Sequence, residues 1–236
     1  SAPAQMNIPR DMWTQVIDVE LPQMVRFERP AGGEEAIARA AELLSKARFP
    51  VILSGAGVVL SGAIPDLAKL AERLDAPVCS NYQHNDSFPG SHPLAVGPLG
   101  YNGSKAAMEL IAKADVVLAL GTRLNPFSTL PGYGIDYWPK NADVIQVDIN
   151  ADRIGLTKKV TVGIEGDATK VARAILAQLS DDAGDTGRED RRNLVSLTKS
   201  RWAQELSSLD HEEDDPGTGW NEESRKRDAD LMSPRQ

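Results

Sequence analysis

The clearest feature of the chain is a succession of helix-like and strand-like hydrophobic patterns that begins after Gly33. Between residues 34 and 47, apolar residues recur three or four positions apart, which places them on one face of a helix. Residues 50–54 then form a short, uninterrupted apolar run of the kind found in parallel strands that are buried on both faces. Helical spacing resumes after Gly57 and continues to Leu74. The pattern predicts a helix, a strand, a tight turn and a second helix.

The same strand pattern returns along the chain. It is found at residues 77–80, 115–120 and 143–148 and, more weakly, at residues 160–164. Helical patterns at residues 104–113 and 168–179 lie between or after these runs. Parallel neighbours need crossover connections, which are right-handed. We therefore expect the α/β class: a Rossmann-like, doubly wound parallel sheet of about five or six strands with helices on both faces.

The first thirty residues depart from this alternation. Residues 5–9 alternate between apolar and polar as a short strand would, but they have no neighbouring hairpin or helix to pair with. Residues 13–30 include Pro22 and Pro30 and show no sustained period, which is typical of an extended linker. A domain boundary near Pro30 follows.

The last part of the chain also differs from the middle. Residues 191–206 form one amphipathic stretch, expected to be a helix packed on the edge of the domain or on a neighbour. Residues 210–236 are charged and have little to bury, so we interpret them as a linker. The predicted division is 1–30 for the end of a preceding domain plus a linker, 31–180 for one central domain, and 181–236 for a peripheral helix and an acidic linker.

Composition narrows the possible partners. The 236 residues carry 26 basic and 34 acidic side chains, a net charge of −8, and no basic stripe is interleaved with aromatic residues. We therefore expect no nucleic acid partner, and the lack of an apolar run of about 18 residues predicts no membrane span. Cys79 is the only cysteine, which suits a cytoplasmic protein without an internal disulfide. Residues 1–9 show no signal sequence, and the chain reads as an excised or processed segment.

Two glycines follow the first predicted strand directly. Gly55 and Gly57, together with Ser54, are candidates for a nucleotide-binding turn, because glycines let backbone N–H groups and a helix N-terminus approach an anion. An equally good interpretation is that they only turn the chain and allow close packing. Leu60 stands where a dinucleotide fingerprint has its third glycine, and residues 78–81 offer no acid for a ribose, so nicotinamide dinucleotides are disfavoured.

Two later turns supply the remaining candidates. Gly121, Thr122 and Arg123 follow the third strong strand, and Asp148 and Asn150 follow the fourth. Both turns would lie at the carboxyl edge of the sheet, where open α/β folds bind ligands. The alternative is that Arg123 pairs with a nearby carboxylate and Asp148 caps a helix.

No catalytic or metal-binding constellation is recognisable in the sequence. The histidines are His84, His92 and His211, and none has a second histidine or a cysteine at the spacing of metal ligands. Ser54 precedes the glycine turn instead of lying inside a Gly-x-Ser-x-Gly elbow. We therefore assign no catalytic residue and no metal ligand.

Several segments resemble, in the same order, the middle domain of thiamine-diphosphate-dependent enzymes such as acetolactate synthase, pyruvate oxidase and oxalyl-CoA decarboxylase. These segments are residues 50–57 (PVILSGAG), 70–78 (LAERLDAPV), 88–94 (FPGSHPL), 114–123 (ADVVLALGTR), 144–150 (VIQVDIN) and 166–168 (GDA). Together the resemblance covers roughly residues 34–179. The flanking residues 5–13 and 232–235 look like the edges of this family's pyrimidine-binding and pyrophosphate-binding domains, and point to a branch that transfers an acetyl group to phosphate.

The resemblance implies a central structural and assembly domain that is inactive alone. Thiamine diphosphate and Mg²⁺ of the intact enzyme would bind outside this chain, to flanking domains of the same polypeptide. Residues 166–168 are not the family's Gly-Asp-Gly motif, because the later asparagine ligand is missing. Relatives of this kind usually work as dimers or tetramers, so a homodimer or homotetramer is expected when the protein is intact.

In flavin-binding members of this family, turns equivalent to the candidate turns hold an adenine nucleotide. The resemblance thus supports a vestigial or ADP-type pocket formed by Ser54, Gly55, Gly57, Gly121, Thr122, Arg123, Asp148 and Asn150. FAD is not expected in the acetyl-transferring branch. The alternative is an adenine-nucleotide (FAD or ADP) module of an acetolactate synthase-like carboligase or decarboxylase, while a free-standing oxidoreductase is disfavoured.

Overall fold

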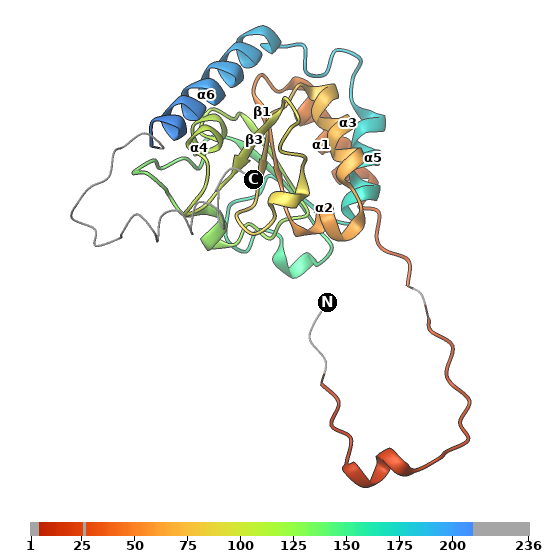
Figure 1. The fold of residues 1–236 in the computed structure, drawn as a ribbon. Coiled ribbons are helices and arrows are strands. Elements are labelled where there is room, and N and C mark those ends of the chain that lie inside the picture. Colours follow the sequence, from red (N-terminus) through yellow and green to blue (C-terminus); the bar gives the residue numbers. More distant parts are fainter. Residues whose placement is uncertain (1–4, 26, 210–236) are drawn as a thin grey trace, which may run out of the picture.

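The computed structural model describes residues 5–25 and 27–209 and contains one parallel six-stranded sheet (Figure 1). The strands lie side by side in the order β3-β2-β1-β4-β5-β6, and every neighbouring pair is parallel. The winding direction reverses between β1 and β4, which makes their carboxyl ends the switch point of the sheet. The strands are β1 (Pro50–Ser54), β2 (Val78–Ser80), β3 (Ala95–Pro98), β4 (Val116–Leu120), β5 (Asp143–Asp148) and β6 (Val162–Glu165).

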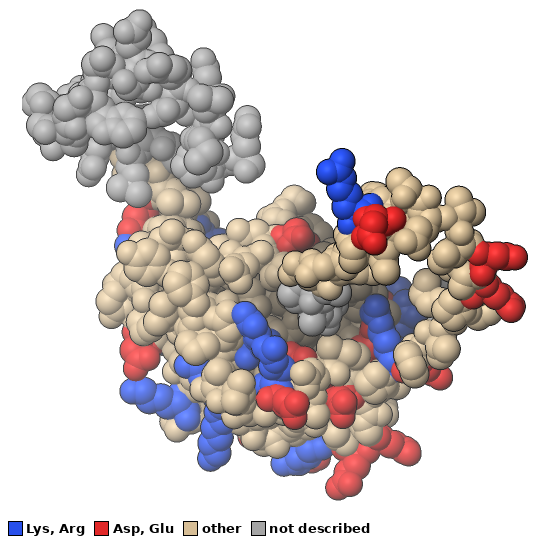
Figure 2. Space-filling view, turned by 90° about the horizontal axis from the view of Figure 1, so that it is seen from below, with Lys and Arg blue, Asp and Glu red and all other residues tan. Residues whose placement is uncertain are grey.

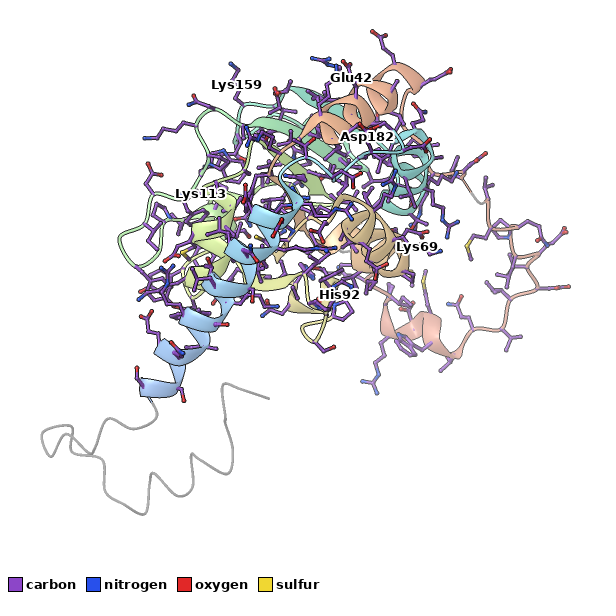
Figure 3. All side chains as sticks on the ribbon, turned by 90° about the horizontal axis from the view of Figure 1, so that it is seen from above. Glu42, Lys69, His92, Lys113, Lys159 and Asp182 are labelled. Carbon is purple, nitrogen blue, oxygen red and sulfur yellow. The ribbon has the colours of Figure 1, made fainter. Side chains whose placement is uncertain are left out.

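Helices cover both faces of this sheet (Figure 1). The α-helices are α1 (Glu34–Lys46), α2 (Ala56–Ser61), α3 (Ile64–Leu74), α4 (Lys105–Ile111), α5 (Ala168–Gln178) and α6 (Arg188–Leu209). Helices α1, α3 and α5 pack on one face over buried side chains such as Ile52 and Leu118, whereas α4 and α6 pack on the other over Val51 and Val117. Figure 3 shows α6 lying apart from Glu42 on α1 and Lys69 on α3. The predicted doubly wound α/β fold is confirmed.

The pattern of apolar runs located five of the six strands and missed β3. That strand is short and contains Gly97 and Pro98, two residues that are depleted in strands, so no apolar run marks it. Proline is tolerated there because β3 is an edge strand, where one side of the backbone needs no ladder partner. Residues 5–9 form no strand.

The single helix predicted up to Leu74 is wrong, because two helices occupy this stretch. Gly62 has a φ of 74° and ends α2 in the left-handed region, which glycine adopts without a steric penalty. Pro65 then lies in the first turn of α3, where its missing N–H costs nothing. The helices predicted at residues 34–47, 104–113, 168–179 and 191–206 are confirmed as α1, α4, α5 and α6. The linker predicted at residues 210–236 lies outside the described residues.

The turns that follow β1 and β4 touch through their backbones. The Gly57 N–H donates to the Gly121 carbonyl at 2.8 Å, and the Gly55 N–H donates to the Leu120 carbonyl at 3.1 Å. A Cβ atom on Gly57 would lie 2.6 Å from Gly121 Cα, and one on Gly121, whose φ is 62°, would lie 2.7 Å from the Val58 nitrogen. The two turns can approach this closely only because neither glycine has a side chain.

A buried arginine ties α6 to the rest of the domain. The Arg191 guanidinium donates to the carbonyls of Leu74 and Asp75 at the end of α3, and to those of Arg48, Thr186 and Gly184. The last carbonyls of a helix lack partners within the helix, so Arg191 supplies donors that α3 needs. Burial lowers the pKa of Arg191, and the nearby Asp75 carboxylate partly opposes this shift. Further along α6, Lys105 and Glu205, and Arg201 and Glu109, form ion pairs with α4.

None of the helices in the described ranges is long and apolar enough to cross a membrane.

We predict that Gly57→Ala lowers the free energy of unfolding by about 2–3 kcal/mol, because the new methyl group must push the two backbones apart. Gly90→Ala is the matched control, since its Cβ would meet no atom within 4 Å and should change stability by less than about 0.5 kcal/mol. Urea titration of both variants checks this. Equal stability of the two variants would contradict the close-packing argument.

We expect Arg191→Met to destabilise the domain by about 3–5 kcal/mol, because carbonyls paired with the guanidinium lose their donors. The neighbouring Arg192 is largely exposed and, among the described residues, bonds only the Asp75 carboxylate. Arg192→Met should therefore cost about 0–1 kcal/mol. The comparison is made by thermal and chemical denaturation, and similar losses for the two variants would be evidence against a special role for Arg191.

Candidate functional site

A cavity of about 590 Å³ lies at the carboxyl edge of the sheet, over the switch point between β1 and β4. Its walls come from the turns that follow β1, β2, β4, β5 and β6. Parallel neighbouring strands all end at the same edge, so segments that are far apart in the sequence meet here. Figure 2 views the molecule from the side on which α2 lies in Figure 1, and basic side chains stand among acidic ones on this face.

Six of the eight predicted site residues line this cavity: Gly57, Gly121, Thr122, Arg123, Asp148 and Asn150. Ser54 and Gly55 do not. Ser54 is fully buried, and its hydroxyl donates to the Ser87 carbonyl at 3.2 Å. A Cβ on Gly55 would lie 2.6 Å from the Thr122 side chain, so this glycine lies behind the cavity wall.

The glycine turn uses most of its amides within the fold. The N–H groups of Gly55 and Gly57 donate to carbonyls of the β4 end and turn, and the Val58 N–H donates back to Gly55. Helix α2 is also only six residues long. The turn thus packs closely on the β4 turn, while the Ala56 N–H forms no hydrogen bond with the described residues and belongs to the cavity lining.

Asn81 and Thr122 form a polar pair at the floor of the cavity. Asn81 Nδ2 donates to Thr122 Oγ1 at 2.8 Å, and the same oxygen accepts the Leu124 N–H at 3.2 Å. Asn81 is 8% exposed, and its Oδ1 atom has no hydrogen-bond partner among the described residues. Leu124 has a φ of 51°, so the turn bends sharply just after Arg123. A buried acceptor without a donor is rare in proteins and marks a position that a ligand donor can satisfy.

Two arginines at the cavity have no ion pair within the described part of the chain. They are Arg123, which is exposed, and Arg153, which is half-buried. The predicted alternative, in which Arg123 pairs with a carboxylate, is therefore not what the structure shows. Asp148 accepts the Asn150 N–H at 2.9 Å, and Asn150, rather than Asp148, caps the 3-10 helix that follows by accepting the Asp152 N–H at 3.0 Å.

A third arginine reaches the cavity from the N-terminal segment. Arg29 Nη1 lies 2.8 Å from Asp167 Oδ2, and Asp167 also accepts the N–H groups of Thr169 and Lys170 at the start of α5. Burial alone would raise the pKa of Asp167, but the hydrogen bonds from Arg29 and from the helix outweigh it and hold this pKa below its ordinary value. Asp167 therefore stays ionised and neutralises Arg29, so that Arg123, Arg153 and the Asp148 carboxylate are lining charges without an ion pair among the described residues.

The sequence analysis did not find Arg29, Asn81 or Arg153. Asn81 carried a usable signal, since it is a polar residue directly after a buried strand, and Arg153 lies within one turn of Asn150. No local pattern identifies Arg29, because it reaches the site through the packing of its segment against α5.

A second cavity, of about 720 Å³, lies between the end of α3, the loop before β3 and α6. The charges around it already have partners: His92 lies 3.2 Å from Glu72, Arg192 pairs with Asp75, and Lys199 donates to a backbone carbonyl at 2.8 Å. Burial lowers the pKa of Lys199. Because it joins no predicted site residue and leaves no buried acceptor open, we do not assign a function to this cavity.

The residues present do not fit a thiamine diphosphate and magnesium site. Asp167 is the acid of the Gly-Asp-Ala turn, and its oxygens are used by Arg29 and by the first turn of α5. Residues 5–25 and 27–209 contain no group of three or more His, Cys, Asp or Glu side chains that could hold a metal ion. His84 also lines this cavity, with its Nδ1 atom 3.5 Å from Asp86 Oδ1, and Arg123 and Arg153 give the same cavity groups that can bind an anion.

The full length of the chain is similar to part of two longer bacterial proteins. It is 73% identical over 235 residues to a sulfoacetaldehyde acetyltransferase of Roseovarius nubinhibens and 70% identical over 235 residues to one of Rhodobacter capsulatus. These alignments cover 100% of the chain but only 39% and 40% of the relatives, so the chain spans well under half of their length.

Structural comparison finds the same kind of protein. A protein of Mycobacterium smegmatis, described as a thiamin diphosphate-dependent enzyme, superimposes with a TM-score of 0.56 at 27% identity, over 68% of this chain and 31% of that one. The family described as "Thiamine pyrophosphate enzyme, central domain" matches residues 37–175, which are more than half of the chain and include all six strands. The chain therefore belongs to the central-domain family of thiamine pyrophosphate enzymes.

Proposed function

We propose that this chain is the central part of a thiamine-diphosphate-dependent sulfoacetaldehyde acetyltransferase, which converts sulfoacetaldehyde and phosphate into acetyl phosphate and sulfite. The observation that carries this proposal is the 70–73% identity to two proteins of that name over the whole chain. The reaction would belong to the degradation of sulfonates such as taurine and would take place in the cytoplasm.

Within the enzyme, the domain would act as a structural and assembly module. Thiamine diphosphate and Mg²⁺ would be held by pyrimidine-binding and pyrophosphate-binding domains of the same polypeptide, in a homodimer or homotetramer. The lack of a fitting carboxylate set around Asp167 supports this division of labour. The chain would divide into the segment 1–30 from the preceding domain and its linker, the central domain 31–180, and the peripheral helix with its linker 181–236.

A second function, adenine-nucleotide binding, is favoured by one feature of the cavity. Asn81 Oδ1 is a buried acceptor without a partner among the described residues, and Arg123 and Arg153, which form no ion pair there, line the same space. Leu60 and Ile149 are exposed apolar side chains on that lining and offer contact surface for a flat base. An ADP-sized ligand would place its amino group near Asn81 or its phosphates near the arginines. FAD is not part of this proposal.

The enzyme assignment predicts that sulfite release requires a longer polypeptide. This purified chain is compared with the polypeptide extended to the length of its relatives, both with thiamine diphosphate, Mg²⁺, sulfoacetaldehyde and phosphate. We expect sulfite and acetyl phosphate in equal amounts from the longer protein and none from the chain alone, and omission of phosphate should abolish acetyl phosphate. Sulfite release by this chain would overturn the assembly role, and a longer protein that binds thiamine diphosphate but releases no sulfite would refute the substrate.

The nucleotide assignment predicts that ADP binds this chain and raises its melting temperature. Arg123→Gln and Arg153→Gln should each weaken ADP binding about tenfold or more, because a hydrogen bond to a charged group contributes about 1.5–3 kcal/mol. Arg39→Gln is the matched control, since Arg39 lies on α1 and pairs with Glu42. Titration calorimetry measures all four proteins. Absence of heat and of a thermal shift with the unmodified chain would eliminate this second function.

A further inference from the structure

The N-terminal segment carries a strip of largely exposed apolar side chains, formed by Ile17, Val19 and Leu21. Ile17 is 71% exposed, Val19 58% and Leu21 78%. Figure 1 shows this segment, drawn in red to orange, leaving the domain instead of folding onto it. Single exposed apolar residues are common, but a continuous strip marks an interaction site.

The strip has the period of a β-strand. Between residues 17 and 21 the order is Ile-Asp-Val-Glu-Leu, so apolar and acidic residues alternate strictly, and Pro22 follows directly. In an extended chain this alternation places Ile17, Val19 and Leu21 on one face and both acids on the other. That arrangement is typical of a strand with one buried and one solvated face.

The backbone of the same strip is also unpaired. In the described structure, no backbone N–H or carbonyl of residues 16–25 takes part in a hydrogen bond, although the preceding turn at Gln15 and the following Pro30 do. An extended segment with free donors and acceptors and one apolar face is what an open sheet edge accepts as an added strand.

This domain's own nearest sheet edge cannot receive the strip by continuing the existing pairing. Ala31 pairs with Gly166 in an antiparallel bridge at the end of β6, and the Asp167 N–H donates to the Pro30 carbonyl at 2.8 Å. In an antiparallel register, residues before Ala31 lie opposite residues after Gly166, which belong to α5. Lys170 fixes this direction by binding Glu28 and the Arg29 carbonyl. Continuing this pairing would therefore place residues 17–21 beyond the end of β6, where they cannot pair with that strand.

We propose that residues 17–21 add as a strand to the open sheet edge of a neighbouring domain of the same polypeptide, with Ile17, Val19 and Leu21 packed on an apolar surface beside that edge. This inference rests on the proposed function, because the relatives of which this chain spans 39–40% contain the additional length that would form such a domain. A partner on the same polypeptide is favoured over a second copy, since the anchor at Lys170 and Asp167 keeps the strip close to its own chain at a high effective concentration.

The test exploits a property of strands that pair on one side only. The N–H groups of alternate residues face the partner, so proline, which has none, breaks the pairing at every second position and is tolerated in between. Proline and alanine variants are made singly at Ile17, Asp18, Val19 and Glu20 in the polypeptide extended to the length of its relatives. Comparison of proline with alanine at each position removes the effect of the lost side chain.

Amide hydrogen exchange by mass spectrometry gives the readout. Amides of residues 17–21 should exchange at least about tenfold more slowly in the longer polypeptide than in this chain. Compared with alanine at the same position, proline should abolish this protection when it replaces Ile17 or Val19, or when it replaces Asp18 or Glu20, but not in both cases. Ile17→Ala and Val19→Ala should lower the melting temperature of the longer protein more than Asp18→Ala and Glu20→Ala do.

Three results would overturn the inference. Equal exchange in the short and long proteins would show that nothing covers the strip, and proline effects without alternation would show apolar docking without strand pairing. Protection of this chain alone that grows with its concentration, together with dimer formation, would assign the strip to a second copy. Hydrogen exchange is measured without substrate, so its result does not depend on the outcome of the sulfite assay. Conversely, evidence against strand pairing would leave the proposed substrate unchanged.

Discussion

The arrangement of the carboxyl edge of the sheet depends on one backbone contact between the turns that follow β1 and β4. Gly57 and Gly121 approach so closely that a Cβ on either would lie within 2.8 Å of the other turn's backbone. This contact joins the two turns at the switch point of the sheet, where they form part of the cavity wall. It also sets the path of the β4 turn, so that Thr122 faces Asn81 while Arg123 extends from the surface.

The same contact decides what kind of recognition the cavity can offer. The amides of Gly55 and Gly57 are already hydrogen-bonded to the β4 end and turn, so Asn81, Arg123 and Arg153 are prominent among the lining groups that can still bind a ligand. Side-chain recognition of this kind tolerates substitution more readily than a backbone cradle does, since a single arginine can change without a change in fold.

Sequence reasoning located what depends on local chemistry and missed what depends on distant packing. The buried strands β1, β4 and β5 are continuous apolar runs, and six of eight site candidates followed from the rule that parallel strands end at one edge. Strand β3 was missed because an edge position permits Gly97 and Pro98, and Arg29 because only its contact with Asp167 brings it to the cavity. Ser54 and Gly55 directly precede residues that line the cavity, but they are themselves buried and face the core.

Helix α6 and the N-terminal segment differ in how they are attached to the domain. At the C-terminal end, Arg191 is buried and bonds five carbonyls, so α6 is fixed to this domain by contacts that need no partner. At the N-terminal end, the anchor stops at Glu28 and Arg29, and the apolar side chains beyond it meet no surface of this domain. Exposed apolar area is costly in water, whereas a covered strip would contribute roughly 25 cal/mol per Å² buried. The N-terminal segment is therefore the part of the described chain whose apolar side chains remain exposed, whereas α6 is held by hydrogen bonds and ion pairs within the domain.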